Sequence, residues 1–291
     1  MAIKSAPQEI RIRQGDVILC SPELRKATSE DFDGSTSALF IHGFTADSSY
    51  LSDLMRQFEG AGFRTFAFEY ACFNGIDSAA KSLKQLLSLL ESTGAEIGKL
   101  VVVAHSMGGL VARAFVALEG GAKYVRKLIT LGTPHNGTLR GTRTLQVIAD
   151  WAESINTLNP LGYSIDTLSA KQLIGDDGPE PLLERIKAAK SPLDHIDFLS
   201  ISGGYPYLEF GKNPLKNVIG NAWLQRHLQQ PNDGLVAEVS SNLAQEQFSA
   251  CMPNGMHFRS YPEYHKTNHS NLVNNQSLAL LAASQSLLTQ T

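Results

Sequence analysis

The chain has 291 residues and a mass of 31.6 kDa, with 43% hydrophobic and 18% charged residues. These proportions fit a globular protein with a sizeable core. The net charge of −3 provides no excess of positive charge, so we expect no nucleic-acid partner and at most a peripheral contact with a lipid surface. No stretch approaches the roughly 18 consecutive apolar residues of a membrane-spanning helix.

The N-terminus and the cysteines indicate the cellular compartment in which the protein is expected. Residues 1–14 lack the apolar run of a secretion signal, so we expect a cytoplasmic protein, or a secreted one if such a signal has been removed. Cys20, Cys72 and Cys251 are far apart and do not have metal-ligand spacing. We interpret them as buried thiols, and one disulfide remains the alternative for a secreted protein.

The first half of the chain alternates between strand and helix patterns. We expect an opening hairpin over residues 9–20, strands over 37–44, 63–70, 99–105 and 125–134, and helices over 50–62, 77–94 and 107–121. This alternation is typical of a mostly parallel sheet with helices on both faces.

The alternation stops between residues 138 and 196, where no strand pattern occurs. Helical spacing predicts a helix over 142–155, and shorter helices follow at 168–174 and 181–190. Strand patterns return at 196–204 and 256–264 with a looser stretch between them, and a closing helix is expected over 272–288. We therefore expect a single domain, residues 1–291, with residues 138–196 inserted between two strands of its sheet.

The stretch "VVVAHSMGG" places Ser106 between a buried strand and a helix. A sharp turn at this point exposes its central side chain, and it requires small neighbours such as Ala104 and Gly108. The start of the helix also favours negative charge. The alternative is a serine that only caps the helix, but the strand before it and the helix after it favour a nucleophile.

A serine nucleophile needs a base and an acid that orients the base. In this arrangement the chain order is serine, acid, histidine. His269 lies between the last expected strand and the closing helix and is our choice for the base, with His265 as the alternative. Asp233 in "PNDGLV" is our choice for the acid, although an aspartate in such a turn can be purely structural.

The developing oxyanion needs two backbone N–H donors. One is expected from Met107, the residue after the nucleophile. The other is expected from the loop after the strand at 37–44, where "HGF" favours Phe44.

Taken together, "FIHGF", "AHSMGG", "LGTPHNGT", "NDGLV" and "NHSNLVN" resemble the α/β-hydrolase family, and within it the bacterial true-lipase and carboxylesterase branch. The resemblance implies the same triad of Ser106, Asp233 and His269. It also implies hydrolysis of acylglycerols or other acyl esters through an acyl-enzyme, with residues 138–196 as a helical lid. Acyl transfer and thioester hydrolysis on the same triad stay open, as does a non-catalytic binding protein.

The resemblance also bears on the acyl pocket and on cofactors. Leu145, Ile148 and Trp151 offer apolar surface for an acyl chain, or they only pack the insert against the domain. Many relatives bind calcium through an aspartate two residues after the catalytic histidine. This chain has the uncharged Asn271 there, which can coordinate calcium but supplies no charge, so we expect no cofactor, with a structural calcium ion as the alternative. For His135 in "TPHNG" we expect a structural hydrogen bond.

Overall fold

The structure is a computed structural model that describes residues 16–35, 37–138, 167–209, 214–228, 231–245, 254–276 and 282. Its centre is a seven-stranded sheet with the order β1-β3-β2-β4-β5-β6-β7. The strands are β1 (Ile18–Cys20), β2 (Ser37–Ile41), β3 (Arg64–Glu69), β4 (Leu100–His105), β5 (Val125–Leu131), β6 (Asp197–Ser202) and β7 (Gly255–Ser260). β1 is antiparallel to β3, and the other neighbouring pairs in this sheet are parallel.

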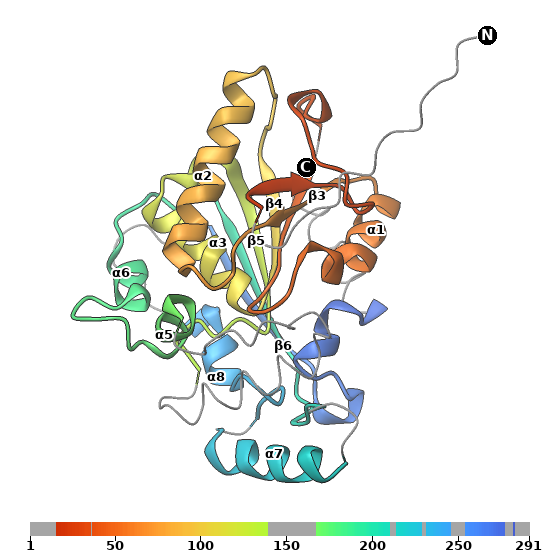
Figure 1. Cartoon of the computed structure of the whole chain (residues 1–291), viewed down its shortest axis with the longest axis vertical. Helices are drawn as coiled ribbons and strands as arrows, with labels where there is room; N and C mark the ends of the chain where they lie inside the picture. The colour runs from red at the N-terminus through yellow and green to blue at the C-terminus, as the bar shows by residue number, and fades with distance from the viewer. Residues whose placement is uncertain are drawn as a thin grey trace.

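Helices cover both faces of the sheet. The described part of the chain contains the α-helices α1 (Ser52–Gly60), α2 (Ile76–Ser92), α3 (Met107–Leu118), α5 (Leu168–Ile174), α6 (Leu182–Ala188), α7 (Pro214–His227) and α8 (Glu238–Ser241). α2 and α3 lie on one face and α1 on the other, while α5, α7 and α8 lie beyond the carboxyl ends of the parallel strands (Figure 1). No helix in the described ranges is long and apolar enough to cross a bilayer.

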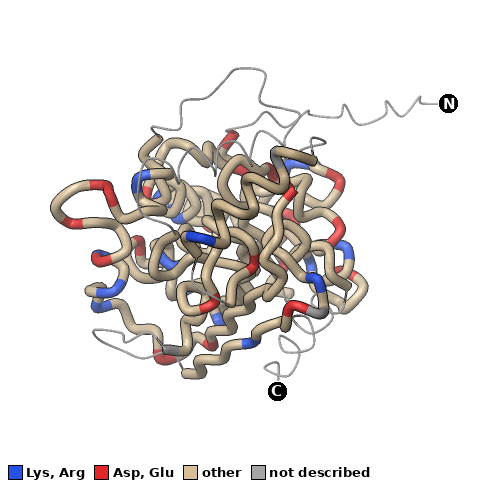
Figure 2. The backbone as a smooth tube through the Cα atoms, turned by 90° about the horizontal axis from the view of Figure 1, so that it is seen from below, with Lys and Arg blue, Asp and Glu red and all other residues tan. Residues whose placement is uncertain are grey.

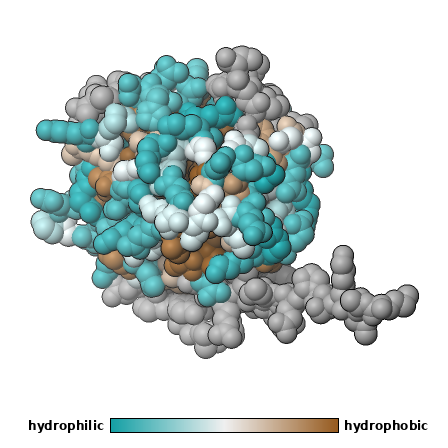
Figure 3. Space-filling view, turned by 90° about the horizontal axis from the view of Figure 1, so that it is seen from above, coloured by the Kyte–Doolittle hydropathy of each residue, from teal (hydrophilic) through white to brown (hydrophobic). Residues whose placement is uncertain are grey.

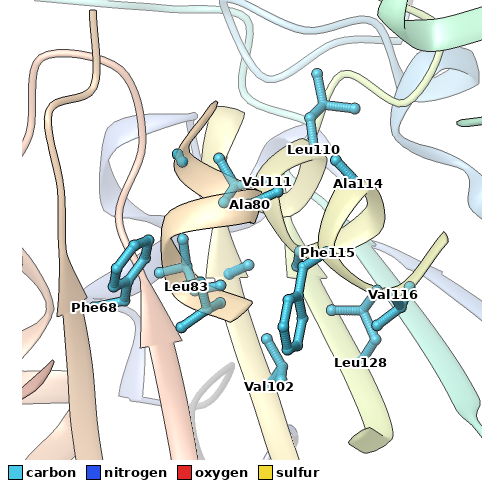
Figure 4. Packing of buried hydrophobic residues seen from close by; sticks show 14 of the residues in the cluster. Phe68, Ala80, Leu83, Val102, Leu110, Val111, Ala114, Phe115, Val116 and Leu128 are labelled. Atoms are coloured by element: carbon cyan, nitrogen blue, oxygen red, sulfur yellow. The ribbon is translucent and has the colours of Figure 1, made fainter. Parts of the chain in front are cut away.

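The alternation of side chains along the strands divides the core into two layers. Leu39 of β2 and Val102 of β4 belong to the layer under α2 and α3, whereas Phe40 and Val103 belong to the layer under α1. In the first layer, the side chains of the sheet meet the apolar face of α3, including Phe115 (Figure 4). Every residue of β2 and β4 is buried, as expected for parallel strands covered on both faces.

The expected fold class and the regular elements of the first half are confirmed. β2 to β5 and α1 to α3 fall inside or at the edges of the expected ranges, and β6 and β7 match the two later strands. The second strand of the expected hairpin corresponds to β1, and the residues before 16 lie outside the described part. The same holds for the helix over 142–155. Of the closing helix, Gln276 and Ala282 are helical, and the residues around Ala282 are not described.

The stretch after β6 was wrongly expected to be irregular, because residues 214–227 form α7. Apolar residues occur on both sides of this helix: Leu224 is fully buried, whereas Val218 and Ile219 are exposed. A helix that is apolar on opposite sides lacks the single apolar stripe on which sequence recognition depends.

The described end of the 138–196 insert packs against the start of α2. The Gln172 side chain accepts a hydrogen bond from the Ile76 N–H (2.6 Å) and donates one to Asp77 (2.8 Å). Arg185 pairs with the same carboxylate at 2.7 Å. Gln172 thus satisfies a free N–H group in the first turn of α2, and Arg185 neutralises the Asp77 carboxylate. These contacts attach α5 and α6 to the body of the protein. A lid over the whole of 138–196 stays a prediction.

Candidate active site

Ser106 lies in the sharp turn between β4 and α3. Its backbone has φ 54° and ψ −127°, in the positive-φ region that residues with a Cβ rarely adopt. Two hydrogen bonds hold it there. The Ser106 N–H donates to the Leu131 carbonyl (2.8 Å), and the Thr133 hydroxyl donates to the Ser106 carbonyl (2.9 Å). The end of β5 therefore supports the strained turn from behind.

Glycines allow the turn to approach the loop after β2. A Cβ added at Gly108 would lie 2.4 Å from the carbonyl oxygens of both Ile41 and His42. A Cβ added at Gly43 would lie 2.9 Å from the Cβ of Ser106. Because two of these three contacts are with backbone atoms, neither side could move away cheaply. The small residue expected at position 108 is thus required by packing.

Ser106, His269 and Asp233 form one hydrogen-bonded chain. His269 Nε2 lies 2.9 Å from Ser106 Oγ, and His269 Nδ1 lies 2.9 Å from Asp233 Oδ2. His269 and Asp233 are completely buried, and Ser106 is 8% exposed. With its proton on Nδ1 facing the carboxylate, the ring presents Nε2 as the acceptor for the serine proton. The structure therefore brings the three residues chosen from the sequence together.

Asp233 has a separate role for each of its carboxylate oxygens. Oδ2 faces His269, while Oδ1 accepts the N–H groups of Leu235 (3.0 Å) and Val236 (2.7 Å). The Asn232 side chain accepts the N–H of Gly234 in the same turn (2.9 Å). The two interpretations of Asp233 are therefore compatible, since it stabilises its own turn and orients the histidine.

Several hydrogen bonds besides the one to the carboxylate fix the His269 loop. The His269 N–H donates to the Asp233 carbonyl (2.8 Å), and the Tyr50 hydroxyl donates to the Ser270 carbonyl (2.6 Å). His105 Nε2 lies 2.9 Å from the His269 carbonyl. Burial lowers the pKa of His105 to about 3, so the ring is neutral and its Nε2–H is the donor. Neither Tyr50 nor His105 was assigned a role from the sequence.

Gly132, directly after β5, lies beneath the acid and the base. Its φ is +58°, and an added Cβ would lie 2.9 Å from Asp233 Oδ2 and 3.0 Å from His269 Nδ1. No side chain fits between Gly132 and the hydrogen-bonded pair. The signal available in the sequence was the glycine of "LGTP" at the end of an expected strand.

Phe44 and Met107, the expected oxyanion donors, flank Ser106. Phe44 follows Gly43, which touches Ser106, and Met107 is the first residue of α3. The ring of Phe44 packs edge-on against Phe73, with centroids 5.2 Å apart. Nothing in these contacts tests the donor role, which stays a prediction.

Several other expectations concern residues around the site. His135 is buried, and its Nε2 lies 3.0 Å from the Thr130 hydroxyl, as expected of a structural histidine. Asn271 uses both ends of its amide within its loop: the oxygen accepts the Asn268 N–H (2.6 Å) and the nitrogen donates to the Lys266 carbonyl (3.0 Å). In the described ranges, no group of three or more His, Cys, Asp or Glu residues could hold a metal ion. The absence of a cofactor stays a prediction.

The described thiols are free and buried, which fits the first interpretation of the cysteines. Burial raises the pKa of Cys20 to about 11 and that of Cys72 to about 12, so neither is a reactive thiolate at neutral pH. Cys251 lies outside the described residues. So do Leu145, Ile148 and Trp151, the expected acyl-pocket residues.

Comparison with known proteins gives one family match and many similar structures. Residues 77–207 match the family described as PGAP1-like alpha/beta domain. The mature form of Bacillus licheniformis lipase BlEst2 matches with a TM-score of 0.53 at 18% identity, over 86% of this chain and 94% of that chain. No curated protein matches the chain in sequence.

Two further structures have the same architecture. The product of gene lin2722 from Listeria innocua has a TM-score of 0.55 at 15% identity, covering 88% of this chain and 95% of that chain. A carboxylesterase structure from the thaumarchaeon Nitrososphaera gargenis has a TM-score of 0.51 at 12% identity, covering 89% and 93%. At such identities the likeness shows the fold alone, which is the α/β-hydrolase fold expected from the sequence.

Proposed function

We propose that the chain hydrolyses carboxylic esters through an acyl-enzyme formed on Ser106. The observation that carries the proposal is the buried succession of Asp233, His269 and Ser106, with 2.9 Å at each step. A serine hydroxyl is a weak nucleophile alone, and this arrangement supplies the base and the group that orients it. That solved structures of the same fold are called a lipase and a carboxylesterase adds support.

In the first half of the reaction, His269 Nε2 takes the proton of Ser106 as Oγ attacks the ester carbonyl carbon. Asp233 stabilises the imidazolium that results. The backbone N–H groups of Phe44 and Met107 hold the oxyanion of the tetrahedral intermediate. His269 then protonates the alcohol oxygen as the C–O bond breaks, which leaves the acyl group on Ser106.

In the second half, water replaces the alcohol. His269 removes a proton from the water as its oxygen attacks the acyl carbon, and the same donors hold the second oxyanion. Collapse of this intermediate returns the proton to Ser106 and releases the carboxylic acid. No step requires a metal or an organic cofactor.

The substrate class can be identified from the preferred acyl chain length and from the rate on dissolved and undissolved substrate. We expect turnover of p-nitrophenyl esters and acylglycerols with acyl chains from about two to sixteen carbons to identify the preferred length. A sharp rise in rate above the solubility limit of the substrate would support the lipase form of the proposal. A flat response would leave the esterase form.

Labelling with a fluorophosphonate probe tests the nucleophile directly. We expect the wild-type protein to be labelled at Ser106, and Ser106→Ala to lose labelling and on the order of 10⁶ in kcat for p-nitrophenyl esters. The matched control is Ser92→Ala, because Ser92 lies at the far end of α2 and its hydroxyl only donates to the Leu89 carbonyl. Ester turnover retained by a folded Ser106→Ala protein would overturn the proposal.

A further inference from the structure

One side of α7 presents large apolar side chains to solvent. Leu215, Val218 and Ile219 are 64%, 66% and 60% exposed. Positions i, i+3 and i+4 lie on one face of a helix, so the three side chains form a continuous apolar stripe. We call these three residues the α7 stripe. Contiguous exposed apolar surface of this kind marks interaction sites, whereas single exposed apolar residues are ordinary.

The opposite side of α7 is attached to the body of the protein, and this attachment fixes the direction of the stripe. Leu224 is fully buried in the core. The Asn221 side chain accepts the Leu208 N–H (2.8 Å) and donates to the Leu208 carbonyl (2.7 Å). Gln225 donates to the Pro206 carbonyl (2.7 Å). Rotation of α7 to bury the stripe would break these hydrogen bonds and expose Leu224.

The stripe is at the end of the molecule that holds the candidate active site. α7 lies between β6 and the Asp233 turn in sequence, beyond the carboxyl ends of the strands (Figure 1). Two more exposed apolar residues, Leu168 of α5 (45%) and Val239 of α8 (52%), belong to helices at this same end. The opposite end of the molecule is mainly hydrophilic, with several apolar areas between the hydrophilic ones (Figure 3).

The charge of α7 favours an anionic over a neutral surface as the binding partner of the α7 stripe. The helix contains Lys216, Arg226 and His227 and no aspartate or glutamate, in a chain whose net charge is −3. Elsewhere acidic and basic positions are interspersed (Figure 2). A basic helix with an apolar outer side has the composition of helices that lie in the interface of an anionic bilayer, where each Lys or Arg adds roughly 1 kcal/mol.

We propose that α7 docks on an anionic lipid bilayer, with the α7 stripe inserted at the boundary between headgroups and acyl chains. The helix axis lies in the plane of the interface, and the exposed Arg226 side chain meets the anionic headgroups. This placement turns the carboxyl edge of the sheet, and with it Ser106, toward the lipid. The docking does not depend on the hydrolysis proposed above, because the stripe lies outside the triad.

Sedimentation with sucrose-loaded vesicles tests the docking. We expect the protein to bind vesicles of phosphatidylcholine with about 30% phosphatidylserine, and several-fold less to phosphatidylcholine alone or when NaCl is raised from about 0.1 M to 0.5 M. Ile219→Ser should lower the partition coefficient about tenfold, and the Val218→Ser, Ile219→Ser double variant should lower it further. Leu89→Ser is the matched control, because Leu89 is equally exposed (60%) but lies near the far end of α2.

The outcomes separate the two proposals. Ser106→Ala should bind vesicles like the wild type, and the double variant should keep wild-type turnover of a short water-soluble ester. Absence of binding to anionic vesicles, or equal binding by the double variant and the wild type, would overturn the docking proposal. So would a concentration-dependent dimer that the double variant abolishes, because the stripe would then be an interface between two copies of this chain.

Discussion

Close packing and hydrogen bonds contribute differently to the two parts of the candidate site. The turn that carries Ser106 depends on close packing of Gly108 against the carbonyls of Ile41 and His42, and two hydrogen bonds with the end of β5 support it. The loops that carry Asp233 and His269 depend more on hydrogen bonds, many of them from side chains, although Gly132 also packs against both residues. A tightly packed turn has no room to adjust, whereas a hydrogen bond can be lost or replaced singly.

This difference predicts different costs for substitutions. A change in the packed turn should reduce stability and activity together, because the backbone must shift. A change in the loops should reduce activity more than stability, provided that the new side chain keeps the local hydrogen bonds. Substitutions in each part of the site test this contrast.

Asp233→Asn tests the loops at the residue that bonds both its own turn and His269. The amide oxygen can keep accepting the N–H groups of Leu235 and Val236, so we expect the turn to persist and the melting temperature to fall by no more than about 4 °C. The amide nitrogen then faces His269 Nδ1 and favours the wrong tautomer, which should lower kcat by about 10⁴. Ester kinetics and calorimetry measure the two effects. A large loss of stability with this variant would show that the loops are as intolerant as the turn.

Gly108→Ala tests the packed turn. The added methyl would lie 2.4 Å from two carbonyl oxygens, so we expect a loss of about 3 kcal/mol in the free energy of unfolding and about a 10²-fold loss of activity from the displaced Ser106. Urea unfolding and ester turnover provide the readouts. Gly60→Ala is the control: it ends α1 with nothing within 4 Å of the added Cβ, and it should be neutral or slightly stabilising. Equal behaviour of the two variants would contradict the packing argument.

The fold and the triad were accessible from the sequence for physical reasons. Strands buried on both faces have continuous apolar runs in the sequence. α1 and α2 have one apolar side and α3 is apolar almost throughout, so β2 to β5 and α1 to α3 followed from the sequence pattern. The expected order of serine, acid and histidine then limited the choice of residues, because each must follow a different strand at the carboxyl edge of the sheet. Asp233 could be chosen as the candidate acid because the residues that form its turn are adjacent in the sequence.

The supporting contacts were not accessible, because they join segments that are distant along the chain. Tyr50 and Ser270 are 220 positions apart, and no local pattern marks either one. Gly132 is a glycine because of Asp233 and His269, which approach it only after folding. α7 was missed for a different reason, since its two apolar sides hide the helical period.

His105 links the two parts of the site, because it belongs to β4 and donates to the His269 carbonyl at 2.9 Å. His105→Phe removes this donor from the buried carbonyl, so we expect about a tenfold loss in kcat and a loss of about 0.5–1.5 kcal/mol in the free energy of unfolding. In His105→Gln the terminal amide nitrogen can take the place of Nε2, and we expect most of both losses to be restored. Ester kinetics and urea unfolding of the pair measure this. If the two variants were equally impaired, the ring itself and not its hydrogen bond would be what matters.

The last prediction concerns stability alone, which should depend on pH because of buried histidines beside the packed turn. Burial lowers the pKa of His42, His105 and His135, that of His105 from 6.5 to about 3. Between these values the unfolded chain binds protons that the folded chain does not, so the free energy of unfolding falls as the pH drops below about 6.5, by at most about 1.4 kcal/mol per pH unit for each histidine. Urea unfolding at about pH 7.5 and pH 5 measures the slope. His105→Gln removes one of the three groups, so its slope should be smaller than that of the wild type by up to one histidine's share, and an unchanged slope would show that His105 is protonated in the folded state.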